Sequence, residues 1–205
     1  NCLIKQLQSI FEPKVNQTPS KVELDKVVAF YNKGQLKEAL LSGHELVARY
    51  PDSSMLENIL GVLYAASKQF NDALLHYDNA LRLKPDYPEA LNNKGNTLNE
   101  LGNYNDALSC FENALRKMPD YAEAHNNLGS LLHNMGELKK AQGYYQNSID
   151  LKPDYVEAYN NLGNVCADLN QPTLALQYFA KALRIDPNFV QAYNSIGHTL
   201  RLLGR

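Results

Sequence analysis

The chain has 205 residues, of which 44% are hydrophobic and 20% are charged, and its formal net charge is -2. This balance is that of a folded globular chain and excludes a disordered one. The small negative charge gives no general attraction to nucleic acid or anionic lipid, and no apolar run approaches the roughly 18 residues of a membrane span. We therefore expect neither a nucleic-acid-binding protein nor a membrane protein.

Three cysteines, Cys2, Cys110 and Cys166, lie far apart in the sequence and lack metal-ligand spacing. An odd number of separated cysteines argues against a disulfide framework and favours a reducing compartment. We expect the protein in the cytoplasm.

The first segment, residues 1–12, carries apolar residues at helical spacing and ends before Pro13. It predicts a short N-terminal helix that caps the helices that follow. Two alternatives stay open: a second helix left from an upstream repeat, or an element for self-association. Residues 13–19 predict a linker because they are polar and contain two prolines. The chain opens on Asn1 rather than methionine, which places the natural start upstream as an expectation.

From residue 20 onward the sequence repeats itself every 34 residues. A fixed period of this length is the signature of a repeat array, in which each repeat buries its apolar face against its neighbours. The period is carried by five glycines and five prolines: Gly61, Gly95, Gly129, Gly163 and Gly197, with Pro51, Pro85, Pro119, Pro153 and Pro187. The expected units are 20–53, 54–87, 88–121, 122–155 and 156–189, followed by a half repeat over 190–205.

Each unit contains two amphipathic patterns, at positions 1–14 and roughly 17–30, and no segment alternates like a strand. The sequence therefore predicts an all-α protein of antiparallel helix pairs. Gly34, Gly102 and Gly136 are expected to end the first helix of a pair in the left-handed conformation. Pro172 is expected at the first position of a helix.

The repeat keeps small residues at positions 8, 20 and 27 and an aromatic residue at position 24. Small residues let two helices approach while the aromatic ring is expected to fill the gap between units. The first unit departs from this rule, because Val27 stands at position 8 and Gly43 at position 24. Terminal repeats are often atypical, so we interpret 20–53 as a degenerate first repeat.

The recurring spacing within the units resembles the tetratricopeptide repeat family over about nine tenths of the chain. In the unit 54–87 the signature residues are Leu60, Gly61, Tyr64, Ala73, Tyr77, Ala80 and Pro85. In the unit 156–189 they are Leu162, Gly163, Ala175, Phe179, Ala182 and Pro187. The resemblance implies a right-handed superhelical α-solenoid whose first helices line a concave groove.

No arrangement in the sequence points to catalysis. The chain lacks a phosphate-binding glycine loop, and its histidines occupy different repeat positions, so neither a metal site nor a nucleophile and base pair follows from their spacing. We expect no enzyme activity in this chain, no metal and no cofactor. The histidines are His44, His76, His125, His133 and His198.

Positions 2, 5, 6, 9, 12 and 13 of each first helix are assigned to a face opposite positions 4, 8 and 11, which pack inward. This face is rich in asparagine and edged with acid. The candidate residues of a peptide-binding groove are Glu89, Asn92, Asn93, Asn96, Glu123, Asn126, Asn127, Ser130, Glu157, Asn160, Asn161, Asn164, Asn194 and His198.

An asparagine side chain offers both donor and acceptor groups, so a row of them can bind the amides of an extended peptide. The alternative is that asparagine merely solvates the helix face or reflects recent duplication of one repeat. Because asparagine is a poor helix former, a purely solvating face would more readily use Glu, Lys or Gln, which favours recognition. The series Asn93, Asn127 and Asn161 resembles the asparagine ladder in the repeat domain of O-linked N-acetylglucosamine transferases.

Glutamates at position 2, Glu89, Glu123 and Glu157, disfavour a C-terminal carboxylate as ligand. The predicted function is therefore a protein-interaction scaffold for a neutral to basic, extended peptide or partner segment. The alternative is the substrate-recruiting N-terminal region of a larger bacterial enzyme, a glycosyltransferase or sulfotransferase. An apolar stripe in the last helix, Ile196, Leu200 and Leu203, predicts self-association through a second copy of the chain.

Overall fold

The computed structural model describes residues 18–204. All regular structure in this range is α-helical, as the sequence predicts, and no strand occurs in it. The helix expected over residues 1–12 and most of the expected linker lie outside the described residues. None of the described helices is long and apolar enough to cross a membrane.

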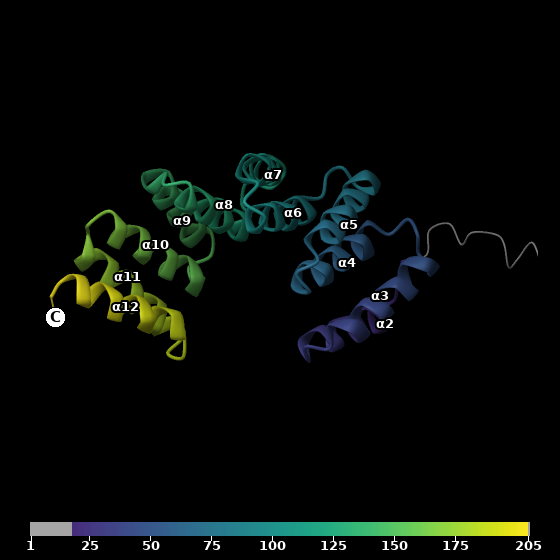
Figure 1. Ribbon diagram of the computed structural model, residues 1–205, viewed down its shortest axis with the longest axis horizontal. Helices are drawn as coiled ribbons and strands as arrows, with labels where there is room; N and C mark the ends of the chain where they lie inside the picture. The colour runs from purple at the N-terminus through teal and green to yellow at the C-terminus, as the bar shows by residue number, and fades with distance from the viewer. Residues whose placement is uncertain (1–17, 205) are drawn as a thin grey trace, which may run out of the picture. The chain divides into compact units, whose positions relative to one another are not determined.

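The helices follow one another in pairs, a first helix of 12 or 13 residues and a second of 14, from α2 at the N-terminal side to the unpaired α12 (Figure 1). Their bounds are α2 Lys21–Asn32, α3 Leu36–Arg49, α4 Ser54–Ala66, α5 Phe70–Leu83, α6 Pro88–Glu100, α7 Tyr104–Lys117, α8 Ala122–Asn134, α9 Leu138–Leu151, α10 Val156–Asp168, α11 Pro172–Ile185 and α12 Val190–Leu202. Helix α11 begins at Pro172, which confirms the position expected for this proline.

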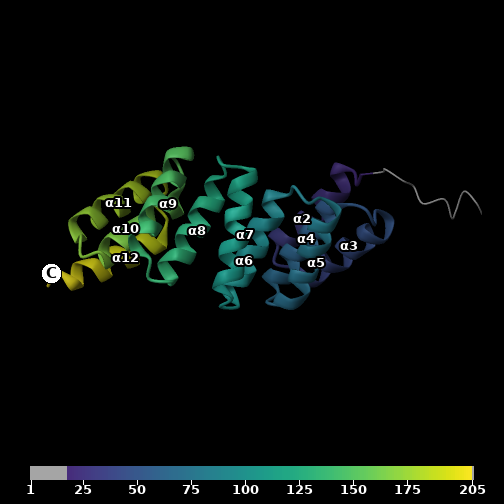
Figure 2. The ribbon, with the colours of Figure 1, turned by 90° about the horizontal axis from the view of Figure 1, so that it is seen from above.

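The chain forms two compact units, Asn1–Asn93 and Lys94–Arg205, which we call unit 1 and unit 2. In unit 1, α3 packs on α2 and on α4, and α4 packs on α5. In unit 2, each helix from α7 to α12 packs on the next, and α10 also contacts α8 and α12. Figure 2 shows α10, α11 and α12 side by side in unit 2. Each unit is thus an all-α stack of helical repeats.

The turn between the two helices of a pair passes through the left-handed conformation at position 15 of the repeat. Gly34, Gly102 and Gly136 have φ angles of 72°, 77° and 79°, which confirms the expectation for these glycines. Two repeats place a side-chain-bearing residue there: Lys68 at φ 58° and Asn170 at φ 60°. Asparagine tolerates this conformation better than lysine does.

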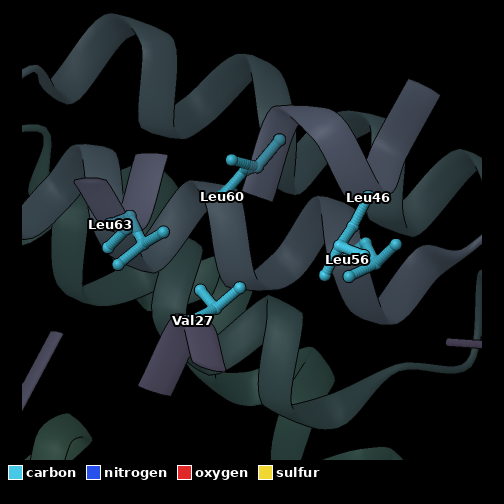
Figure 3. Packing of buried hydrophobic residues seen from close by; sticks show 6 residues of the cluster. Val27, Leu46, Leu56, Leu60 and Leu63 are labelled. Atoms are coloured by element: carbon cyan, nitrogen blue, oxygen red, sulfur yellow. The ribbon is translucent and has the colours of Figure 1, made fainter. Parts of the chain in front are cut away.

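The first repeat keeps a tight core although its side chains at positions 8 and 24 are exchanged in size. Val27 is buried, and a Cβ added to Gly43 would lie 2.7 Å from Cδ2 of Leu60 in the next repeat. Glycine at position 24 thus makes room for a leucine of α4. Figure 3 shows Val27 and Leu60 in one cluster with Leu56 and Leu63.

Candidate functional site

Polar side chains at positions 5, 6 and 9 recur on the first helices α4, α6, α8, α10 and α12. We call this surface the asparagine face and describe it within each unit separately. In unit 1 it comprises Asn58, Asn92 and Asn93; in unit 2 it comprises Asn96, Asn126, Asn127, Ser130, Asn160, Asn161, Asn164, Asn194, Ser195 and His198.

Three of the asparagines at position 5 are buried, contrary to their expected place on an open face. Asn92, Asn126 and Asn160 expose only 4%, 6% and 7% of their surface. An α-helix turns by about 100° per residue, so position 5 lies only about 60° around the helix from the packed position 8. The assignment of position 5 to the side opposite the packed stripe was therefore wrong.

The other predicted site residues reach solvent to different degrees. Asn194 and His198 of α12 are exposed, as are Glu89 and Glu157 at position 2. The remaining ones are partly exposed: Asn93, Asn96, Glu123, Asn127, Ser130, Asn161 and Asn164.

Buried and partly exposed asparagines are joined from one first helix to the next. In unit 1, Asn93 Nδ2 donates to Asn58 Oδ1 at 3.1 Å. In unit 2, Asn161 Nδ2 donates to Asn126 Oδ1 at 3.0 Å. Both bonds join position 5 of one repeat to position 6 of the next, 35 residues later. We call these links the asparagine ladder; it uses Asn58, which the sequence reasoning missed although it occupies the same repeat position.

A second row of contacts in unit 2 joins positions 12 and 13 with the same offset of 35 residues. His133 Nε2 lies 2.6 Å from Asp168 Oδ2, and Asn134 Nδ2 donates to Asn99 Oδ1 at 3.5 Å. Successive first helices are therefore connected near both ends of this face by polar side chains. These contacts hold the side chains of the face in defined orientations.

The acidic edge is partly neutralised. Lys152 Nζ donates to Glu123 Oε1 at 2.8 Å. This hydrogen bond holds the pKa of the Glu123 carboxyl below its ordinary value, and the same bond raises the pKa of Lys152. Glu89 in unit 1 and Glu157 in unit 2 are exposed, and we assign to each the negative charge of the edge in its own unit.

A group of aromatic and titratable residues in unit 1 was not expected from the sequence. His44 Nε2 lies 2.8 Å from the Tyr64 hydroxyl oxygen, and the Tyr64 ring stacks on His76 with centroids 5.1 Å apart. His76 Nδ1 in turn lies 2.7 Å from Oε2 of Glu57, which is buried. The two histidines occupy positions 25 and 23 of successive repeats, so repeat spacing alone did not reveal their contact. Among the described residues, no group of three potential ligands could hold a metal ion.

The apolar stripe of α12 is only partly covered. Ile196 and Leu200 are half-buried, and Leu203 exposes 41% of its surface. Its burial by a second copy stays a prediction.

Comparison with protein families identifies the repeats. A family model described as "Tetratricopeptide repeat" matches residues 120–188, and one described as "TPR repeat" matches residues 61–102 and 95–136. The chain belongs to the tetratricopeptide repeat family. This confirms the resemblance seen in the sequence, and tetratricopeptide repeat (TPR) proteins serve as scaffolds for protein–protein interaction. Comparison with curated proteins gives no match.

Solved structures of other TPR proteins share the fold. TTC0263 from Thermus thermophilus is 21% identical, with a TM-score of 0.78 over 88% of this chain and 98% of its own. MamA from Desulfovibrio magneticus is 22% identical, with a TM-score of 0.66 over 82% and 96% of the two chains. YrrB, described as a TPR protein with an unusual peptide-binding site, is 18% identical, with a TM-score of 0.63 over 93% and 96%. At these identities the similarity shows the helical repeat fold alone.

Proposed function

We propose that this TPR protein binds an extended polypeptide segment on its asparagine face. The observation that carries the proposal is the asparagine ladder, in which Asn161 Nδ2 donates to Asn126 Oδ1 at 3.0 Å. The bond fixes the carboxamide of a partly exposed residue against a buried one. A fixed carboxamide needs less ordering when it binds a ligand, which favours affinity.

The ladder leaves hydrogen-bonding capacity for a partner. A carboxamide has two N–H donors and an oxygen with two lone pairs, and the bond from Asn161 to Asn126 uses one donor and one lone pair. Partly exposed Asn164 and exposed Asn194 add two further carboxamides in unit 2. We assign direct contacts to the partly exposed and exposed residues, and to buried Asn126 a supporting role.

The same assignment applies to the predicted residues that remain. In unit 1, Asn93 would contact the partner and buried Asn92 would support the face. In unit 2, direct contacts are assigned to Asn96, Asn127, Ser130, Asn161, Asn164, Asn194 and His198, and support to Asn126 and Asn160.

The charges of the face favour a neutral to basic partner. Glu89 and Glu157 are exposed, whereas Glu123 is hydrogen-bonded to Lys152. An acidic ligand would meet like charge at the exposed glutamate of either unit, so we propose that such ligands bind less well. The peptide-binding site named for YrrB supports the proposal only through a shared fold.

A selection from a phage library of random 12-residue peptides tests the proposal. Selected peptides are synthesised, and their Kd values are measured for the wild-type chain and for the double variant Asn164→Ala/Asn194→Ala. We expect at least about a tenfold rise in Kd, since two hydrogen-bonding groups are removed from the contact surface. The matched control is Asn147→Ala, an exposed asparagine on the second helix α9.

Equal affinity of the double variant and of wild type, with unchanged helical circular dichroism, would contradict the proposal. The triple variant Asn93→Ala/Asn127→Ala/Asn161→Ala is less suitable, because it also removes the donors to partly exposed Asn58 and to buried Asn126, and so disturbs the ladder itself.

The second sequence-based hypothesis concerns a longer protein, in which this face would recruit substrates for a transferase domain. The reading frame beyond Arg205 tests it. We also propose a cytoplasmic location, because Cys110 and Cys166 are free thiols in the structure, as suits a reducing compartment.

A further inference from the structure

The asparagine ladder is interrupted in unit 2 at Asn160. In the step before, buried Asn126 accepts a hydrogen bond from Asn161, which stands 35 residues later in the sequence. Asn160 occupies the repeat position of Asn126 in the next repeat, and the residue 35 positions after it is Ser195. A serine side chain is one bond shorter than that of asparagine and ends in a hydroxyl rather than an NH₂ group.

The interruption leaves a buried acceptor without a donor. Asn160 is 7% exposed, and its Oδ1 accepts no hydrogen bond within the described part of the chain. Buried polar atoms are almost always paired, because an unpaired one loses its hydration without compensation. Asn160 Oδ1 is thus a buried acceptor without a donor among the described residues.

Asn160 Oδ1 itself is covered, but residues near it on the asparagine face reach solvent. Helix α12 contacts α10 and α11, and its Asn194 and His198 are exposed. Ser195 is partly exposed beside them, and Asn164 is partly exposed one turn further along α10. A ligand group can therefore approach the asparagine face next to the short side chain of Ser195.

We infer that the interruption at Asn160 and Ser195 is a subsite for the side-chain carboxamide of an asparagine or glutamine in the bound polypeptide. Its NH₂ group donates to Asn160 Oδ1, as Asn161 does to Asn126 Oδ1 one repeat earlier. A side chain reaches a buried oxygen more easily than a backbone N–H in an extended strand does. The inference rests on the proposed function, since it requires a polypeptide on this face.

Ser195→Asn is the variant that tests the subsite. It restores the missing ladder residue, so its own NH₂ group should pair with Asn160 Oδ1 and occupy the place of the ligand side chain. We expect a higher urea midpoint for this variant than for wild type, because a buried acceptor becomes paired. Ser195→Ala is the matched control: it supplies no donor and should keep the peptide preference of wild type.

The ligand experiment uses the random 12-residue phage library on wild type, Ser195→Asn and Ser195→Ala. Wild type and Ser195→Ala should select peptides with Asn or Gln at one position, and Ser195→Asn should lose that preference. A synthetic peptide from the wild-type pool is then compared with its Asn→Asp or Gln→Glu counterpart. We expect about a tenfold or greater loss of affinity for wild type, since a carboxylate oxygen cannot donate to Asn160 Oδ1, and a smaller loss for Ser195→Asn.

The outcomes separate the subsite from the proposed function. The selected peptides could depend on Asn164 and Asn194 but show no preference for Asn or Gln, and bind Ser195→Asn as well as wild type. This result would overturn the subsite and leave the asparagine face as the binding surface. In that case solvent satisfies Asn160 Oδ1. Peptides that bind but do not depend on Asn164 and Asn194 would overturn the proposed function itself.

Discussion

The ring of Phe179 lies against the backbone of Gly163, so that a Cβ at Gly163 would come within 2.7 Å of Phe179 Cδ1. Gly129 is related to Tyr145 in the same way, with an added Cβ 2.9 Å from Cδ1. The glycine of position 8 and the aromatic residue of position 24 are thus one packing unit. Gly197 in α12 differs, because no described atom outside the adjoining backbone of α12 and its two chain neighbours lies within 4 Å of the corresponding Cβ.

This difference predicts opposite effects of alanine at two glycines of equal repeat position. Gly163→Ala should lower the free energy of unfolding by about 1–3 kcal/mol, since the methyl group overlaps the ring of buried Phe179. Gly197→Ala should raise helix stability by up to about 1 kcal/mol, because alanine is the better helix former. Urea unfolding followed by circular dichroism measures both. Equal effects at the two sites would contradict the packing argument.

Lys68 occupies the left-handed turn position at which Gly34, Gly102, Gly136 and Gly204 stand in other repeats. Lys68→Gly should stabilise unit 1 by about 1 kcal/mol, because glycine has no Cβ to strain in this conformation. The reverse exchange, Gly102→Lys, is the control in unit 2 and should destabilise by a similar amount. No atom lies within 4 Å of a Cβ at Gly102, so its cost would come from the backbone alone. A less stable Lys68→Gly variant in urea would refute the prediction.

Burial raises the pKa of Tyr145 to about 12, from an ordinary value of 10.0. The raised pKa means that the folded protein keeps the proton longer than the unfolded chain does. The resulting stability is fully present below pH 10 and is lost as the pH rises from 10 to about 12. The loss amounts to about 2–3 kcal/mol at its end.

Tyr145→Phe should therefore flatten the decrease in stability between pH 10 and 12. The ring itself fits, since Phe111 and Phe179 occupy the same position of neighbouring repeats. At pH 7 the variant should be about 1 kcal/mol less stable, because it loses the hydrogen bond between the Tyr145 hydroxyl and Ser130. Ser130→Ala removes that bond but keeps the Tyr145 hydroxyl. This variant should therefore retain the decrease in stability between pH 10 and 12. Parallel pH profiles of wild type and Tyr145→Phe would rule out Tyr145 as its source.

The apolar stripe of α12 predicts self-association of the chain. Leu203→Asp should abolish it, because a charge would have to be buried against the second copy. Static light scattering over a range of concentrations should show a rising mass for wild type and a constant monomer mass for the variant. Leu75→Asp, at another exposed leucine, is the control and should behave as wild type. A wild-type chain that stays monomeric throughout would disprove the prediction.

Much of the fold could be predicted from the sequence because it depends on contacts repeated in every unit. Spacing alone indicated the helix pairs, the left-handed turn at Gly102 and the start of α11 at Pro172. It also indicated that position 8 has to be small and that position 24 is aromatic. The ring was expected between units, whereas the structure packs it on the glycine of its own repeat. Such features depend on residues close in the sequence or recur every 34 residues, so each repeat provides the same evidence for them.

The candidate site was less predictable, because its polar groups pair between repeats at a separation of 35 residues rather than the repeat period of 34. The sequence placed Asn126 and Asn160 on an open face, whereas both are buried. The contact of His44 with Tyr64 and His76 joins different repeat positions and leaves no periodic signal.

The sequence by itself determined the period, the two helices of each repeat and the asparagines at positions 5 and 6, because these depend on residue type and spacing. Only the tertiary structure decided which of those asparagines are covered and which donor meets which acceptor. The reason is that donor and acceptor belong to different first helices, as Asn161 of α10 and Asn126 of α8 do. Asn126 and Asn160 are the same residue at the same repeat position, yet Oδ1 of Asn126 accepts from Asn161 whereas Oδ1 of Asn160 has no donor among the described residues.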